Sequence, residues 1–145
     1  GNGGLKEELK KQKIPNLEIK DFVQPDQMAE EYASASCFLI ASTFEPWGIV
    51  IHEAAASGLP IITSSACGAA DIFVEDSVNG FIFPQDNCDA LTECMIKIHN
   101  MTENKWHEMS RISKEKSRKV TPEKWAKALI KLIHSLSEER PPIES

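Results

Sequence analysis

Residues 36–64 read SCFLIASTFEPWGIVIHEAAASGLPIITS, and this stretch decides the fold class. A short apolar run at 36–42 precedes a helical segment at 48–57, which Gly58 closes, and a second apolar run follows at 60–64. Short strands that alternate with helices indicate a mostly parallel sheet that is covered by helices on both faces. The stretch therefore predicts an α/β protein.

The same alternation continues on both sides of this stretch. Further strands are predicted at 16–22 and 80–84. Helices are predicted at 5–12, 26–35, 68–74, 88–99, 103–119 and 122–136. We interpret residues 1–120 as one Rossmann-like region, 121–137 as a helix packed on it, and 138–145 as a flexible tail.

The last predicted helix has clear limits and an apolar face. Thr121 supplies an N-cap, and Pro122 is suited to the first helical position. One stripe of the helix carries Trp125, Leu129, Leu132, Ile133 and Leu136. A stripe of this kind is typical of a helix that packs on a neighbour.

Composition excludes several classes of function. The chain has 145 residues, 41% of them hydrophobic, which suits one domain with a core, and its net charge of -6 argues against nucleic acid as a partner. The apolar runs are too short to span a membrane, and no export signal opens the chain. Four cysteines without a CxxC pair or zinc-ligand spacing indicate reduced thiols in a cytoplasmic protein without a metal site.

Charge is distributed unevenly along the chain. Residues 105–134 contain nine basic and three acidic side chains. A solvated helix surface is the favoured interpretation of such a run. Peripheral contact with an anionic membrane is the alternative.

The junction between the strand at 36–42 and the following helix carries the candidate chemistry. In doubly wound sheets such a junction lies at the carboxyl edge, where ligands bind. The start of a helix offers unpaired backbone N–H groups and the positive end of the dipole, which suit a phosphate. Gly48 removes the side chain that would block the close approach of a diphosphate.

Two carboxylates flank this predicted anion site. Glu45 lies in the loop before the helix, and Glu53 lies eight residues later, in the second turn. Carboxylates accept hydrogen bonds from sugar hydroxyls, so the pair would suit the diols of a nucleotide sugar. Taken alone, each glutamate is better explained without a ligand, Glu45 as an ordinary loop acid and Glu53 as a solvated helix acid.

Several motifs in one order resemble a known family. The segment from Glu45 to Ala54 resembles the E-x7-E signature of group 1 (family 4) retaining glycosyltransferases of the GT-B fold. The strands and turns that follow it are similar to the family's G-x-P-V-I, G-G-x-x-E and N-G-L/F-L/V motifs. These matching segments are Gly58–Ile62, Cys67–Asp71 and Asn79–Ile82, with Asp86, Gly1–Gly3 and Asn16–Val23 as further points of likeness. The resemblance covers about the first hundred residues.

The resemblance implies transfer of a sugar from a nucleotide-diphosphate donor with retained configuration, without a metal or other cofactor. Glu53 would hold the ribose hydroxyls, and Glu45, the catalytic candidate, would bind and position the donor sugar. The donor-binding candidates also include the amides of Gly48, Ile49 and Val50 at the phosphate, Trp47 beside them, and the backbone of Phe22 and Val23 at the base. For Trp47, a role as a loop anchor is the favoured interpretation.

The sequence also departs from the family pattern. Cys67 and Asp71 stand where the family often has glycine and glutamate, and Val23–Gln24 lacks its usual glycine, so base recognition is open. His52 lies beside Glu53 but projects about 100° away from it on a helix, which favours a packing or solvated role.

Part of the family's architecture has no counterpart in this sequence. An N-terminal acceptor domain and the first two strands of the second domain, in the order 3-2-1-4-5-6, are missing. We therefore expect that 1–145 belongs to a longer enzyme, that the missing domain binds most of the acceptor glycan or glycolipid, and that the chain alone is inactive. A non-catalytic nucleotide-sugar binding module is the alternative, and a flavodoxin-like signalling domain is a less favoured one.

Overall fold

The computed structural model describes residues 2–138 and forms two compact units, which comprise Gly1–Ser36 and Cys37–Ser145. This division differs from the predicted single region 1–120. Of the predicted tail at 138–145, residues from 139 onward lie outside the described residues. The first unit forms no sheet within its described residues.

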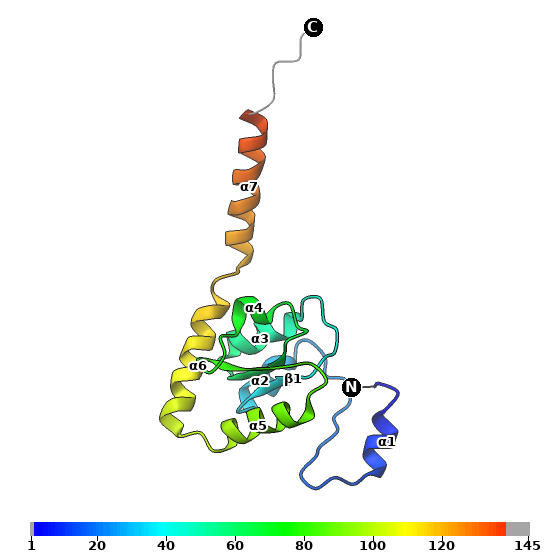
Figure 1. Ribbon diagram of the computed structural model, residues 1–145. Coiled ribbons are helices and arrows are strands. Elements are labelled where there is room, and N and C mark those ends of the chain that lie inside the picture. The colour runs from blue at the N-terminus through cyan, green and yellow to red at the C-terminus, as the bar shows by residue number, and fades with distance from the viewer. Residues whose placement is uncertain (1, 139–145) are drawn as a thin grey trace. The chain divides into compact units, whose positions relative to one another are not determined.

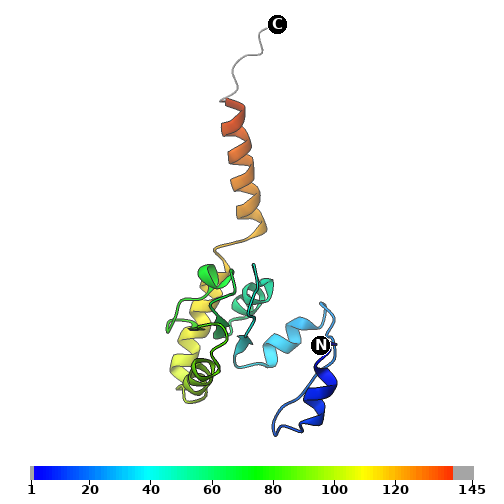
Figure 2. The same ribbon diagram turned by 45° about the vertical axis from the view of Figure 1, so that its right-hand side comes forward.

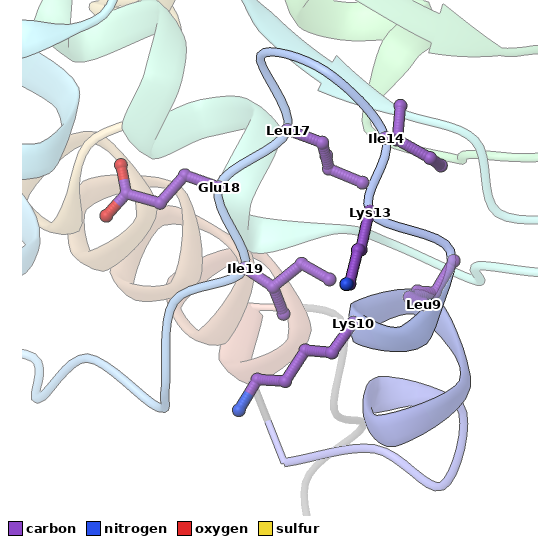
Figure 3. Close-up of a pocket in the computed structure, with 7 residues that line it drawn as sticks. All are labelled: Leu9, Lys10, Lys13, Ile14, Leu17, Glu18 and Ile19. Atoms are coloured by element: carbon purple, nitrogen blue, oxygen red, sulfur yellow. The ribbon is translucent and has the colours of Figure 1, made fainter.

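The first unit contains two short helices. They are α1 (Lys6–Lys11) and α2 (Met28–Ser34), and both were predicted with slightly wider bounds. An ion pair joins Lys6 to Asp21, and the Lys20 ammonium lies 2.7 Å from the Glu31 carboxylate. A groove of about 290 Å³ runs between α1 and residues 13–19 (Figure 3).

The predicted strand at 16–22 is wrong. This segment pairs with no other strand within residues 2–138, and it runs as a loop between α1 and α2 (Figure 2). Leu17 and Ile19 point toward the α1 side of the groove, whereas Glu18 points away (Figure 3). The side chains thus alternate as in a strand, but a strand also needs a hydrogen-bonded neighbour, and the first unit supplies none.

The second unit is built on a three-stranded parallel sheet. Its strands are β1 (Phe38–Ile40), β2 (Ile61–Ser64) and β3 (Gly80–Phe83), in the order β1-β2-β3. Ile62 of β2 stands opposite Leu39 on one side and Phe81 on the other. The predicted parallel α/β architecture is therefore confirmed, although β1 is shorter than the predicted strand at 36–42.

Helices flank both faces of this sheet. The helices of the unit are α3 (Ile49–Ser57), α4 (Ala70–Phe73), α5 (Cys88–His99), α6 (Glu103–Ser117) and α7 (Pro122–Glu138). Helix α3 lies on one face, against β1 and β2, and α5 lies on the other, against β2 and β3 (Figure 1). Helix α6 packs along α3. The sheet is thus covered as a buried parallel sheet requires.

The core lies between β2, β3 and the helices. One cluster of buried side chains on the α5 face comprises Ile62, Phe81, Phe83, Cys94 and Met109. All four side chains of β2 are buried, because this strand has a neighbour on each side and helices over both faces. By contrast, Leu39 of the edge strand β1 is 39% exposed, and this strand has a neighbour on one side only.

Asn79 joins β3 to two helices from a fully buried position. Its Nδ2 donates to the carbonyl of Phe73 and to the hydroxyl of Ser113, each at 3.0 Å, and its Oδ1 accepts from the Glu75 amide at 2.8 Å. An unpaired amide in this position would cost free energy, and the three partners remove that cost. Asn79 therefore fixes the entry into β3 against α4 and α6.

Helix α7 forms where it is predicted but does not pack as predicted. Thr121 caps it, since its hydroxyl accepts from the Lys124 amide at 3.3 Å. The side chains of residues 122–135 are all exposed, and Trp125 is 65% exposed. Packing of 121–137 on the domain is therefore not seen, because none of the described elements of this unit covers the apolar stripe. No helix within residues 2–138 has the length and apolar run needed to cross a membrane.

Candidate donor-binding site

The candidate site begins where the chain leaves β1 at the carboxyl edge of the sheet. Residues 41–48 form the loop that leads from β1 to α3. This loop lies against the turn that follows β2, and three backbone hydrogen bonds join them. The Glu45 amide donates to Ala66, the Gly68 amide donates to Glu45, and the Ala69 amide donates to Trp47, at 3.2, 3.1 and 2.7 Å. The loop is therefore held by the neighbouring strand end.

Gly48 ends the loop in a left-handed conformation and begins α3. Its φ is +87°, and a Cβ added there would lie 3.2 Å from the Cγ of Glu45. Both the positive φ and the close approach favour glycine at this position. The sequence assigned Gly48 to phosphate approach, and the structure adds a local reason for the same residue.

The amino end of α3 is accessible. Among the described residues no side chain caps it, and Ile49 is 62% exposed, whereas Val50 is half-buried. The backbone N–H groups of a first helical turn have no partner within the helix. The helix therefore offers donors and a positive dipole end to an anion.

The two predicted glutamates lie in different elements, one in the loop before α3 and one within the helix. Glu45 is half-buried, and its Oε1 accepts from the Trp47 amide at 3.3 Å, so this carboxylate lies in the loop just before the helix. Glu53 lies on the exposed side of α3, one turn before the end of the helix. Glu45 is therefore partly accessible to solvent in the loop before α3, and Glu53 is exposed on the helix itself.

Trp47 and His52 both pack on the buried Phe73. The Trp47 ring meets Phe73 edge-on at 6.4 Å, and the His52 ring stacks on Phe73 at 4.2 Å. His52 Nε2 also lies 2.9 Å from the backbone oxygen of Ser117 at the end of α6. The packing role predicted for His52 is confirmed, and the contact of Trp47 with Phe73 agrees with a loop anchor.

Phe22 and Val23 belong to the first unit, whereas Glu45 belongs to the second. Phe22 is 62% exposed. With Lys20, Asp21, Met28 and Glu31 the two residues line a groove of about 350 Å³. Their assignment to the nucleotide base stays a prediction.

The turn after β2 is the part of the site that sequence reasoning missed. Cys67 and Gly68 were noted only as members of a family motif, and Ser64 was not noted. In the structure Cys67 is buried and pairs with Glu45 in an isolated parallel bridge. The available signal was Gly68, four residues after the end of β2, because glycine often marks a close approach of two backbones.

The four cysteines of the chain are free thiols. Burial raises the pKa of the Cys37 thiol to about 11. Within residues 2–138, no group of three or more His, Cys, Asp or Glu side chains is arranged to hold a metal ion.

Comparison with known proteins identifies a family and several relatives, two of which are described below. The family "Glycosyl transferases group 1" matches residues 1–120. The sulfoquinovosyl transferase SQD2 of Arabidopsis thaliana is 35% identical over 105 residues, which make up 69% of this chain and 20% of that protein. The GtfA subunit of the UDP-N-acetylglucosamine–peptide N-acetylglucosaminyltransferase of Streptococcus pneumoniae is 27% identical over 146 residues, covering 92% of this chain and 29% of the relative.

A solved structure agrees with this match. The pneumococcal O-GlcNAc transferase GtfA, crystallised with UDP and GlcNAc, superimposes with a TM-score of 0.72 at 24% identity, over 91% of this chain and 28% of that one. This likeness confirms the fold. The chain spans between a fifth and three tenths of the length of these relatives.

Proposed function

This chain belongs to the group 1 glycosyl transferases, and on that premise we propose that it forms the donor-binding part of a retaining enzyme. The donor is a nucleotide-diphosphate sugar, and no metal takes part. The ligands of one relative support this class of donor, since GtfA was crystallised with UDP and GlcNAc.

The accessible amino end of α3 carries the proposal. Gly48 is buried at the start of α3 and Ile49 is exposed, and we assign the amides of Gly48, Ile49 and Val50 to the diphosphate, with the Glu45 carboxylate in the loop just before them. A departing diphosphate gains negative charge in the transition state. Fixed dipoles aimed at that charge lower the barrier without reorganising during the reaction.

The two acids divide the sugars of the donor between them. Glu45 binds and positions the donor sugar: one of its oxygens accepts from the Trp47 amide, and the carboxylate has further acceptor capacity for a hydroxyl. Glu53 binds the ribose diol. This division predicts that loss of Glu45 slows turnover, whereas loss of Glu53 weakens the binding of the nucleotide itself.

The family and the names of the relatives support a proposal for the setting. We propose a role in surface polysaccharide or glycolipid synthesis at the cytoplasmic side, with peripheral contact to the membrane as the alternative to a solvated surface for the basic residues 105–134. Most of the acceptor binds to residues outside this chain, so residues 1–145 alone bind the donor without transferring its sugar. Sugar transfer by this chain alone to any acceptor would overturn that last point.

Calorimetric titration of the full-length protein with UDP-glucose, UDP-GlcNAc, GDP-mannose and ADP-glucose tests the proposal. We expect the donors with one of the three bases to bind best. Glu53→Gln should lower the affinity for the corresponding nucleoside diphosphate by roughly 10- to 150-fold, as for a lost charge-assisted hydrogen bond. Glu93→Gln, an exposed acid on α5, is the matched control and should leave the affinity unchanged. Equal affinities of Glu53→Gln and the control would remove Glu53 from the site.

Turnover then separates an enzyme from a binding module. Release of the nucleoside diphosphate from the bound donor, with or without an acceptor, is expected from the full-length protein and should fall in Glu45→Gln. Binding without any turnover would favour the non-catalytic module instead.

A further inference from the structure

The turn that follows β2 clasps the loop that carries Glu45. The Ser64 side chain is fully buried, and its Oγ donates to the Ser42 carbonyl at 2.5 Å, where the loop leaves β1. The same Oγ lies 3.5 Å from the Cys67 Sγ. One hydroxyl therefore ties the start of the loop to the turn.

Gly68 holds the other end of the same loop. Its amide donates to the Glu45 carbonyl, and a Cβ added at Gly68 would lie 2.3 Å from the Pro46 carbonyl oxygen. Real Cβ atoms essentially never come this close to another atom, and the oxygen that the Cβ would meet belongs to the backbone, so a side chain would force the loop and the turn apart. Residues 45 and 46 can approach the turn this closely only because residue 68 is glycine.

From this geometry we infer that Ser64 and Gly68 are positioning residues for the transferase reaction, because they set where the Glu45 carboxylate stands before the amino end of α3. The inference rests on the proposed function. Glu45 has hydrogen bonds to the turn on both sides of its backbone, so displacement of the turn moves its carboxylate. Glu53 lies beyond this clasp on α3, so its contact with the ribose should depend on the clasp less than the position of Glu45 does.

A positioning role differs from a purely structural one in what it changes. A misplacement of about 1 Å in a reacting group can reduce a rate by about 100-fold. Gly68→Ala should therefore lower kcat for release of UDP from UDP-GlcNAc, or from whichever nucleotide sugar of the panel the wild type cleaves, by about 10- to 100-fold. The Kd for the free nucleoside diphosphate should change by a smaller factor than kcat.

Matched controls account for lost stability. Gly80→Ala places a Cβ 2.0 Å from the Ile61 carbonyl oxygen, between β2 and β3, and so imposes a comparable clash away from the loop. Ser113→Ala removes a fully buried, hydrogen-bonded hydroxyl, as Ser64→Ala does, but on α6. Thermal unfolding identifies any variant that does not fold. If Gly68→Ala or Gly80→Ala does not fold, the comparison of Ser64→Ala with Ser113→Ala still tests the inference. At equal folded fractions, only the Ser64 and Gly68 variants should lose kcat.

The decisive measurement is the double variant Glu45→Gln/Gly68→Ala. If Gly68 acts through Glu45, the second change should add almost nothing to the loss that Glu45→Gln alone produces. Multiplied losses, or equal losses in the controls, would overturn the inference while leaving the proposed function intact. An unchanged kcat in Glu45→Gln itself, or no turnover of any donor by the wild type, would instead defeat the proposed function.

Discussion

Residues 16–22 of the first unit and residues 60–64 of the second were both predicted as strands, yet only the second segment forms one, at Ile61–Ser64. Ile62 of β2 is buried between two parallel neighbours, at positions opposite Leu39 and Phe81. Leu17 and Ile19 share one side of their segment but have no neighbouring strand within residues 2–138. Alternating side chains favour an extended backbone, and a hydrogen-bonded partner makes it a strand.

Truncation of the same side chain in the two segments should give the largest difference. Ile62→Ala removes a 1% exposed member of the core cluster and should cost about 2–5 kcal/mol in the free energy of unfolding. Ile19→Ala in the unpaired segment should cost below about 1 kcal/mol, because this side chain is only half-buried. Urea unfolding of the 145-residue chain measures both. Equal losses would show that the two segments are packed alike.

Glycine substitution in the two units sharpens the contrast with a smaller effect. Gly58 closes α3 with a φ of +81°, and an added Cβ would also meet the flexible Lys114 side chain at 2.4 Å. Gly58→Ala should therefore cost about 1–2 kcal/mol, since an L side chain is strained in the left-handed region. Gly4→Ala is the control because nothing lies within 4 Å of its Cβ, and the same unfolding assay should show almost no change. Similar costs at both positions would contradict the strain argument.

The smallest expected effect concerns the pH dependence of two exposed ion pairs. Lys116 donates to Glu75 at 2.8 Å in the second unit, and this hydrogen bond and charge lower the pKa of Glu75 below its usual 4.5. A lowered pKa gives stability that is complete above the usual pKa and is lost as the pH falls through the folded-state value. The difference in stability between wild type and Glu75→Gln should therefore be complete above pH 4.5 and disappear as the pH falls through the lowered pKa of folded Glu75.

Lys20 and Glu31 in the first unit give the opposite sign. The hydrogen bond with Glu31, together with its charge, raises the pKa of Lys20 above 10.5. This stabilisation is complete below that pH and is lost only as the pH rises through the folded-state value. The difference in stability between wild type and Lys20→Gln should therefore be constant between pH 6 and pH 9 and should decrease only above pH 10.5. A difference that changes within pH 6–9 would contradict this assignment.

Much of the second unit could be predicted because local signals agree with tertiary packing. Gly58 ends α3 and Pro122 opens α7 where the sequence places them, and Cys88–His99 matches α5 at both ends. The segment from Glu45 to Ala54 also placed both candidate acids on one helix and its leading loop. The packing of α7 was predicted wrongly, because an apolar stripe indicates that a partner exists but does not say which element supplies it.

The order of apolar runs, glycines and caps by itself determined the α/β class, the limits of most helices and the family motifs, since these depend on neighbours within a few residues. Tertiary structure decided which extended segment became a strand, where His52 packs and how Ser64 and Gly68 hold the Glu45 loop. Those outcomes depend on backbone groups far apart in the chain meeting at hydrogen-bond distance, and a residue pattern does not specify its distant partner.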